Sequence, residues 1–263
     1  MKISVLTNNL SRDGYASEHG LSIFIKHELY NILFDVGYTD VFIKNAKKLN
    51  VDLNKVEYIV LSHGHYDHTG GLRFLDSCKS LQHIYIHKDA FIEKYAKEQK
   101  NRYNGIPFKE NDLVLTSKHL YKTEGFSEIK PKFYLLSDVL HNNKNTKYYV
   151  GDKLDDFHDE SILILEENNE LSLFMGCSHF GVVNGVEAVK EIFPNKKIKN
   201  LIAGMHLSSK SIEEVDLIGK KLFNLGIQKI YPMHCTGEKA IKYFKEKYND
   251  SCIIIKAGDQ IEI

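Results

Sequence analysis

The fold is decided by the stretch Glu57-Tyr-Ile-Val-Leu-Ser-His-Gly-His-Tyr-Asp-His-Thr-Gly-Gly71. Its first part, Tyr58-Ile-Val-Leu61, is an apolar, β-branched run of the kind that forms a buried strand. Three imidazoles and a carboxylate follow it within a few residues, and this donor set suits a borderline metal such as zinc. They are His63, His65, Asp67 and His68. A polar loop that is merely rich in histidine is the alternative, but so dense a cluster after a buried strand would have no ready structural use.

The spacing of these donors indicates two metal positions. In an extended segment, residues i and i+2 point the same way, so His63 and His65 can bind one ion together. The adjacent pair Asp67 and His68 faces elsewhere, which suggests a second position close to the first. Two neighbouring ions can hold a hydroxide between them. We therefore expect a site for metal-assisted chemistry directly after this strand.

The composition bounds the size of the fold and the class of partner. With 263 residues the chain can bury a substantial core, and we expect a single domain over residues 1–263. Lys+Arg and Asp+Glu are both 35, so the formal net charge of +0 gives no global attraction to nucleic acid or an anionic membrane. We expect neither partner. An anionic substrate would be attracted locally, for example by metal.

The sequence also predicts a compartment. Its apolar runs are shorter than a membrane span, and Met1-Lys-Ile-Ser-Val-Leu-Thr7 lacks the length and cleavage pattern of a signal peptide. A cytoplasmic location is expected. The cysteines are too sparse for a disulfide framework, so we expect reduced thiols. They are Cys78, Cys177, Cys235 and Cys252.

Four predicted strands each deliver histidine just beyond their last apolar residue. These runs end at Ser62, Met175, Ala203 and Tyr231. After the first come the residues named above, and after the others come His179, His206 and His234. In layered α/β folds ligands collect where strands end. Convergence of four strand ends on one site explains this placement, and chance placement of 13 histidines does not.

Periodicity and end signals predict the other elements. Helices are expected at residues 41–49, 90–100, 183–193, 211–225 and 237–248. Residues 161–165 and 171–175 should form a hairpin, and Ser211 should cap the helix that it begins. Lysine-rich faces around Lys44, Lys94 and Lys242 are interpreted as solvated helix surfaces. Residues 101–151 show little periodicity beyond the runs 113–115 and 133–136, and we expect an insertion or lid there.

The motif His63-Gly-His-Tyr-Asp-His68 resembles the His-x-His-x-Asp-His hallmark of the metallo-β-lactamase superfamily, and the resemblance covers essentially the whole chain. It implies an α/β fold, namely an αββα sandwich of two mixed β-sheets with outer helices and a metal site at one edge. Leu33-Phe-Asp-Val-Gly37 is similar to the first motif of the superfamily. Its aspartate, here Asp35, would orient a metal-binding histidine from behind. His179 matches the third motif and His234 the last.

Further segments resemble one branch of the superfamily, named for dihydropterin-ribofuranosylaminobenzene-phosphate synthase. They are Glu18-His-Gly-Leu-Ser22, Gly176-Cys-Ser-His-Phe-Gly181, Gly204-Met-His-Leu207 and His234-Cys-Thr-Gly237. The chain departs from the common pattern at His206, because most members place a bridging aspartate after the third motif. A neutral histidine brings no negative charge. One tightly bound and one weakly bound ion is therefore an alternative to two strong sites.

Spacing and resemblance together give a set of seven expected ligands. His63, His65 and His179 are expected to hold the first metal. Asp67, His68 and His234 are expected to form the second position, with His206 nearby. The expected cofactor is one or two divalent ions, zinc first, with manganese, iron or magnesium as alternatives. For His206, the alternatives are a donor that faces the substrate and a structural residue.

Other polar residues have a structural interpretation beside a functional one. His19 and His87 are interpreted as structural, with a place in the lining of the pocket as the alternative. Cys177 and Cys235 neighbour expected ligands, but buried free cysteine is common packing material, so both are interpreted as structural. The acidic segment Asp155-Asp-Phe-His-Asp-Glu160 either contacts substrate or lid, or forms a solvated turn. None of these residues is counted among the expected ligands.

Metal-assisted hydrolysis is the favoured function. A metal-activated water would attack the carbonyl or phosphoryl centre of a small, anionic ester or phosphoester substrate. Asp67 would orient this nucleophile and accept its proton, and His206 would steady the leaving group.

The branch name implies an alternative, in which an arylamine ribose phosphate displaces pyrophosphate from a dihydropterin-methyl diphosphate. A lid would then have to exclude water. Aromatic residues of that segment could stack on a pterin or belong to the core; they are Tyr103, Phe108, Tyr121, Phe126 and Phe133. A non-catalytic metal-binding protein is a third class. A homodimer is expected from base rates alone.

Overall fold

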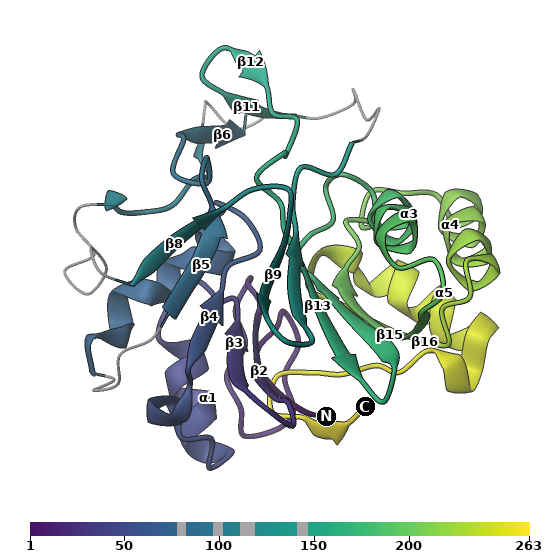
Figure 1. Cartoon of the computed structure of the whole chain (residues 1–263), viewed down its shortest axis with the longest axis horizontal. Helices are drawn as coiled ribbons and strands as arrows, with labels where there is room; N and C mark the ends of the chain where they lie inside the picture. The colour runs from purple at the N-terminus through teal and green to yellow at the C-terminus, as the bar shows by residue number, and fades with distance from the viewer. Residues whose placement is uncertain (78–82, 97–101, 111–118, 141–146) are drawn as a thin grey trace.

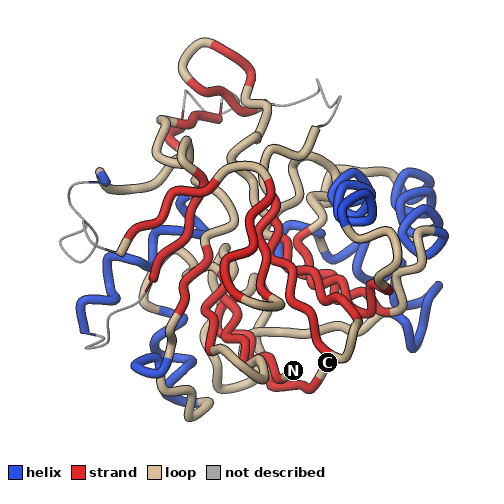
Figure 2. Tube along the Cα trace, in the orientation of Figure 1, coloured by secondary structure: helices blue, strands red, loops and turns tan. Residues whose placement is uncertain are grey.

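The computed structural model describes residues 1–77, 83–96, 102–110, 119–140 and 147–263. Its main body consists of two β-sheets that pack face to face, with helices on the outer sides (Figure 1). Figure 2 shows the same layers by element type, with the strands between two groups of helices. The α/β fold is therefore the αββα sandwich that the sequence predicts.

The first sheet has the strand order β17-β1-β2-β3-β4-β5-β8. Its strands are β1 (Lys2–Thr7), β2 (Ser22–Lys26), β3 (Asn31–Phe34), β4 (Tyr58–Val60), β5 (His83–His87), β8 (Leu120–Thr123) and β17 (Gln260–Glu262). The β1–β2 and β2–β3 pairs are antiparallel, whereas β3, β4, β5 and β8 run parallel. The sheet is thus mixed. β4, which leads into the histidine cluster, is an interior strand with a partner on each side.

The second sheet has the order β16-β15-β14-β13-β10-β9. Its strands are β9 (Phe126–Lys130), β10 (Phe133–Leu136), β13 (Ile162–Glu167), β14 (Glu170–Met175), β15 (Lys197–Gly204) and β16 (Lys229–Met233). The predicted hairpin is confirmed as the antiparallel pair β13–β14. β14, β15 and β16 run parallel, with Met175 opposite Ala203 and Gly204 opposite Met233. Three carboxyl ends therefore reach the same edge of this sheet.

Three apolar layers hold the sandwich together. Between the sheets, Phe34 of β3 and Phe174 of β14 lie in one buried cluster, with their ring centroids 6.0 Å apart. A second cluster lies between the first sheet and the helix α1 (Val41–Lys48), and includes the buried Phe42. A third lies under α3 (Val182–Ile192), α4 (Ile212–Asn224) and α5 (Glu238–Tyr248), on the right in Figure 1. Burial of these faces drives the layers together.

The predicted amphipathic helices are confirmed within one or two residues for α1, α3, α4 and α5. α4 shows the reason most clearly, because Ser211 and Glu214 form a capping box. The Ser211 hydroxyl accepts the Glu214 N–H (3.2 Å), and the Glu214 carboxylate accepts the Ser211 N–H (2.9 Å). Two otherwise unpaired N–H groups are satisfied in this way. After β4 the chain forms two further helical segments, which are α2 (Tyr66–Thr69) and a 3₁₀ helix (Gly70–Ser77).

A small third sheet, which the sequence did not predict, lies above the sandwich in Figure 1. Its order is β12-β11-β6-β7, from β6 (Lys94–Ala96), β7 (Arg102–Tyr103), β11 (Tyr148–Val150) and β12 (Lys153–Leu154). The helix predicted for residues 90–100 is wrong over its described part, because Lys94–Ala96 is a strand paired with Tyr148–Val150. The remaining part of that helix, residues 97–100, lies outside the described residues, as do Cys78 and the predicted strand 113–115.

The described parts of residues 101–151 contribute strands to all three sheets. β7 and β11 belong to the small sheet, whereas β8, β9 and β10 complete the two large ones.

Among the helices that the structure describes, none has the length and apolar composition needed to cross a bilayer.

Candidate metal centre

The first predicted ligand triad comes together beyond the ends of β4 and β14. His63 Nε2 and His65 Nδ1 are 2.9 Å apart. A ring nitrogen of His63, one of His65 and one of His179 all lie within 4.8 Å of one another. All three side chains are buried. Burial holds the pKa of His63 and His65 well below its usual range, so both rings are neutral and offer lone pairs. Three imidazoles in this arrangement suit a transition metal.

The second predicted set lies beside the first. His68 Nε2 is 3.2 Å from His234 Nε2, and Asp67 Oδ2 lies 3.8 Å and 3.4 Å from these two nitrogens. Burial alone would raise the pKa of Asp67, but the charge of His68 and hydrogen bonds from His19 and His234 hold it well below its usual range. Asp67 is therefore an anionic donor among imidazoles. The ring centroids of His63 and His68 are 4.3 Å apart, so the two sets adjoin.

His206 lies at the edge of both sets. Its ring centroid is 4.7 Å from that of His179, and a ring nitrogen lies within 4.8 Å of a donor atom of His179 and of Cys177. Its backbone has a φ of 50°, and that of His234 is 51°. Such positive values are uncommon outside glycine and collect at functional sites. The structure thus brings His206 to the cluster without deciding between ligand and substrate-facing donor.

Two buried nitrogens indicate that a metal ion fits this site. His65 Nε2 and His206 Nδ1 are buried and have no hydrogen-bond partner within the described residues. Leaving such an atom unpaired costs about 1–3 kcal/mol. Coordination to a cation would satisfy each of them. The crowded imidazoles and the carboxylate of Asp67 are also the donors that a divalent transition metal prefers.

Asp35 orients the cluster from behind, as the sequence predicts. It follows β3 with a φ of 54° and is fully buried. Its Oδ2 accepts from His68 Nδ1 (2.7 Å) and from the Ser62 hydroxyl (2.8 Å), and its Oδ1 accepts from the Ser62 N–H (2.7 Å). Burial alone would lower the pKa of His68, but the carboxylates of Asp35 and Asp67 raise it to about 9. The bond to Asp35 leaves Nε2 of His68 facing the cluster.

Sequence reasoning missed the role of the acidic segment, which is not a solvated turn. Glu160 is buried, and its carboxylate accepts from His179 Nδ1 (3.2 Å) and from the Cys177 N–H (3.2 Å). Asp159 is also buried, and its Oδ2 accepts the N–H of Gly64, between His63 and His65 (2.9 Å). Consecutive carboxylates therefore hold both ligand-bearing loops. The signal in the sequence was their position directly before the buried strand β13.

Lys94 also corrects the prediction, because it is a buried residue and not part of a solvated helix face. Its Nζ lies 3.0 Å from Asp159 Oδ1 and 3.2 Å from Asp155 Oδ2, and all three side chains are at most 2% exposed. The pKa of Asp155 is raised, chiefly by burial. This buried ion triad ties the small sheet to the segment that holds the metal loop.

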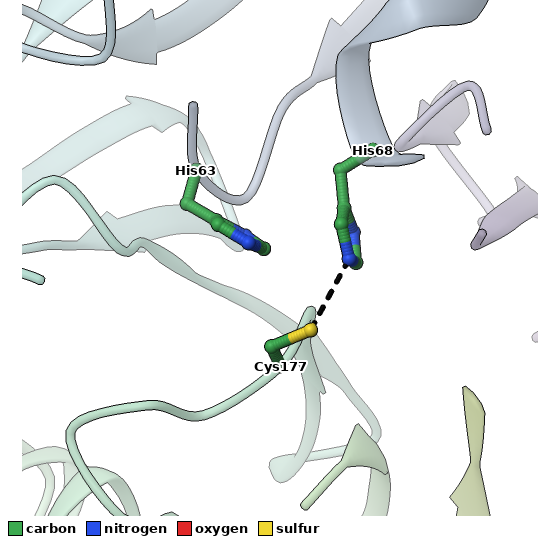
Figure 3. A group of neighbouring side chains, drawn as sticks. All are labelled: His63, His68 and Cys177. Atoms are coloured by element: carbon green, nitrogen blue, oxygen red, sulfur yellow. Dashed lines mark hydrogen bonds between the residues drawn. The ribbon is translucent and has the colours of Figure 1, made fainter. Parts of the chain in front are cut away.

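Cys177 lies in the cluster itself, contrary to its interpretation as packing. Its Sγ is 3.2 Å from His68 Nε2, and Figure 3 shows both side chains and His63 pointing toward one another. Cys235 is partly exposed, and its Sγ lies 3.6 Å from the carbonyl oxygen of Cys177. Only the sequence neighbourhood of His179 and His234 hinted at these positions.

A cavity of about 870 Å³ opens over the cluster. Its polar end contains His65, Asp67, His179, His206 and His234. Aromatic side chains form much of its wall, namely Tyr66, Tyr148, Phe157 and Phe180. Basic side chains also line it, namely Arg102, Lys147, Lys210 and Lys221. The ring of Phe157 stacks on that of His179, with centroids 4.2 Å apart. The cavity combines a candidate metal-binding end, an aromatic wall and basic side chains.

The structure separates the remaining candidates. His19 lines this cavity, and its Nε2 lies 3.1 Å from Asp67 Oδ2. His87 is buried near Asp138 and is not part of the lining among the described residues. The five aromatic residues proposed to stack on a pterin are also absent from the described lining. Phe133, for example, is buried between the two sheets.

Comparisons with known proteins agree with this geometry. A family profile described as "Metallo-beta-lactamase superfamily" matches residues 18–136. An uncharacterised protein of Methanocaldococcus jannaschii is 30% identical over 260 residues, covering 94% of this chain and 95% of the relative. From the same organism, 7,8-dihydropterin-6-methyl-4-(beta-D-ribofuranosyl)-aminobenzene-5'-phosphate synthase is 29% identical over 266 residues, with 94% and 90% covered.

A solved structure gives the same result. Tm1679, described as a metal-dependent hydrolase of the beta-lactamase superfamily, superposes with a TM-score of 0.86 and 34% identity, covering 100% of this chain and 99% of the other. These likenesses support metal-dependent hydrolysis as the general class of chemistry. Together with the profile match and the fold, they show that the chain belongs to the metallo-β-lactamase superfamily.

Proposed function

We propose that this chain is a metal-dependent hydrolase that acts on a small, anionic ester or phosphoester. The observation that carries the proposal is the convergence of the seven predicted ligands, from the ends of β4, β14, β15 and β16, on one cluster, of which five line the cavity: His65, Asp67, His179, His206 and His234. Structural histidines have no reason to face one another with unpaired, buried nitrogens.

Each ligand has a proposed role. His63, His65 and His179 hold one divalent ion, and Asp67, His68 and His234 hold a second, with His206 beside them. We propose zinc, with manganese, iron or magnesium as alternatives. A bound ion would supply a water of lowered pKa and would polarise the bond that breaks. Asp35 and Glu160 keep the rings of His68 and His179 turned toward the ions.

The other steps belong to side chains around the cavity. Asp67 orients the attacking water and accepts its proton, a role that its position beside His234 and its contact with His19 support. His206 donates to the leaving group from the edge of the cluster. The basic residues of the lining attract an anionic substrate. The small sheet contributes Arg102 and Tyr148 to the lining, and we propose that residues 101–151 in part form a lid that limits access of water.

A second candidate is the transfer reaction of the pterin-related relative. The 29% identity over 94% of the chain favours it, as do aromatic side chains beside basic ones in the lining. In that reaction an arylamine nitrogen forms a bond to the pterin methyl carbon, pyrophosphate leaves with the bonding electron pair, and the nitrogen loses its proton to solvent. The third possibility, a protein that binds metal without catalysis, is an outcome of the same test.

The test begins with metal-reconstituted protein and a dihydropterin-methyl diphosphate, with and without an arylamine ribose phosphate. Pyrophosphate release only when the acceptor is present would establish transfer. Without release, a panel of carboxylic esters, thioesters, phosphomonoesters and phosphodiesters follows, and we expect turnover of at least one class. Metal binding without turnover on either panel would favour a non-catalytic protein.

The matched controls are two histidine variants. His63→Ala should abolish both turnover and stoichiometric metal, whereas His83→Ala, at a histidine on β5 outside the cluster, should keep both. Failure of the wild-type chain to retain or take up any transition metal would refute the proposed function.

A further inference from the structure

We propose that Cys177 supplies a thiolate ligand to this metal centre and takes the place of the bridging carboxylate that the sequence lacks. The inference rests on the proposed function, because it requires a metal site. It concerns a residue that the predicted ligand set does not include.

The position of the sulfur is the first argument. Cys177 is buried, and its Sγ lies 3.2 Å from His68 Nε2 (Figure 3). The same sulfur lies within 4.8 Å of a ring nitrogen of each of four other histidines, namely His63, His179, His206 and His234. It is therefore near donors of both predicted metal positions. A ligand that serves two adjacent ions must occupy such a place.

The backbone around Cys177 is the second argument, because it fixes where the sulfur lies. The Cys177 N–H donates to Glu160 Oε1 (3.2 Å), and the Ser178 hydroxyl donates to the Gly204 carbonyl (2.8 Å). Ser178 itself has a φ of 55°. At Gly176 a Cβ would lie only 2.1 Å from Ser62 Oγ, so the loop packs directly against the base of the metal loop. A held backbone of this kind is typical of a preorganised site.

Charge is the third argument. Asp67 is the one carboxylate among the seven predicted ligands, and the other six are imidazoles. Buried charges are stabilised by pairing, so a second anionic ligand would help to compensate two divalent ions beside the carboxylate of Asp67 and a water-derived hydroxide. A thiolate is a strong ligand for zinc and for cobalt. When Cys177 binds, its S–H bond breaks and the proton passes to solvent, so that the thiolate carries the second negative charge.

Cys235 is the natural competitor, because its Sγ also lies within 4.8 Å of Cys177 Sγ and of a ring nitrogen of His234. Its surroundings make it the weaker candidate. Its side chain is partly exposed, and its Sγ points to the carbonyl oxygen of Cys177 at 3.6 Å. It also neighbours His234, whose ring already faces the cluster. Cys235 therefore provides a matched control, namely a thiol in the same region that should not be a principal ligand.

The test uses cobalt(II) in place of the native metal. Wild-type protein and Cys235→Ser are expected to show the near-ultraviolet absorption of thiolate-to-cobalt charge transfer, and Cys177→Ser is expected to lose it. Loss of a residue that only hydrogen-bonds to a metal ligand already lowers metal affinity roughly 10–100-fold. The affinity of Cys177→Ser for the second equivalent of metal should fall by at least as much. Metal should also protect the Cys177 thiol, and not that of Cys235, from a thiol-specific reagent.

Two further measurements keep the result interpretable. Cys177→Asp restores a carboxylate and should bind two equivalents of cobalt without the charge-transfer band, even if Cys177→Ser folds poorly. Circular dichroism of each variant reports folding independently of the metal. Cobalt binding by the wild-type protein without the band, or with a band that only Cys235→Ser removes, would overturn the inference about Cys177 while leaving the metal site intact. No cobalt uptake at all would instead refute the proposed function, and with it this inference.

Discussion

Replacing Lys94 by methionine should destabilise the protein far more than its position on a short surface sheet suggests. The Lys94 ammonium lies 3.0 Å and 3.2 Å from the carboxylates of Asp159 and Asp155, and the three side chains are at most 2% exposed. Methionine keeps much of the length and apolar volume of the side chain. The substitution therefore removes the charge with little change in packing, and leaves two buried carboxylates without their counterion.

The size of the effect follows from these distances. At an effective dielectric constant of about 20, each attraction is worth about 5 kcal/mol, although desolvation of the lysine offsets much of this. Breaking a buried ion pair by removing one partner costs about 3–5 kcal/mol. We expect a loss of that size in the free energy of unfolding. For a domain with a total stability of about 5–15 kcal/mol this is a large fraction.

The assay is urea unfolding of chelator-treated protein, so that bound metal does not add to the stability. Lys44→Met is the matched control, because Lys44 pairs with Asp40 at 2.8 Å on the exposed surface of α1. That variant should lose less than about 1 kcal/mol. A loss below about 1 kcal/mol for Lys94→Met, or equal losses in the two variants, would refute the argument from burial.

The pH dependence provides an independent check. Burial already raises the pKa of Asp155, and the positive charge of Lys94 opposes this rise. Without Lys94 the folded-state pKa should rise further above the unfolded value. A group raised in this way contributes its stability at low pH and loses it as the pH rises through the folded-state pKa. The deficit of Lys94→Met should therefore shrink as the pH falls from neutrality toward the carboxyl range.

Two other substitutions separate orientation of the ligands from stability of the fold. Asp35→Asn keeps a side chain that tolerates the φ of 54°, but it weakens the hydrogen bond to His68 Nδ1 (2.7 Å). Metal affinity, measured by competition with a chromophoric chelator, should therefore fall roughly 10–100-fold. An unchanged affinity would contradict the orienting role. Ser211→Ala removes one half of the α4 capping box and should cost about 1 kcal/mol of unfolding free energy. Its metal content should stay at the wild-type level, because Ser211 is neither a predicted ligand nor part of the cavity lining.

The sequence predicted the elements whose signals are local. The helix α4 was found because Ser211 and Glu214 mark its start and apolar residues recur on one face. The strand β6 was mistaken for part of a helix because the charged residues within 90–100 look solvated in the sequence. The partners that bury Lys94 come from 61 and 65 residues further along the chain. No periodicity within residues 90–100 carries that information.

The candidate site also contains residues that a local sequence signal predicts and residues that only distant contacts reveal. The seven predicted ligands sit at strand ends, where a dense motif and the alternation of strands and helices point to them. Glu160 and Cys177 could be recognised only once the hairpin β13–β14 was placed against β4. Their chemistry depends on contacts with His179 and His68, which lie 19 and 109 residues away in the sequence. A local sequence pattern cannot distinguish such residues from ordinary packing.

The distribution of the ligands along the chain has a consequence for biosynthesis. His68 and His234 face each other across 166 residues of sequence. At about 5–20 residues per second, a ribosome needs roughly 10–30 s to add that length of chain. During this time the early histidines exist without their partners and can hold a metal only as a partial, weaker chelate. The last strand, β17, then pairs with β1 and completes the first sheet. We therefore expect the metal to be loaded after translation, into a chain that has already folded most of its sandwich without it.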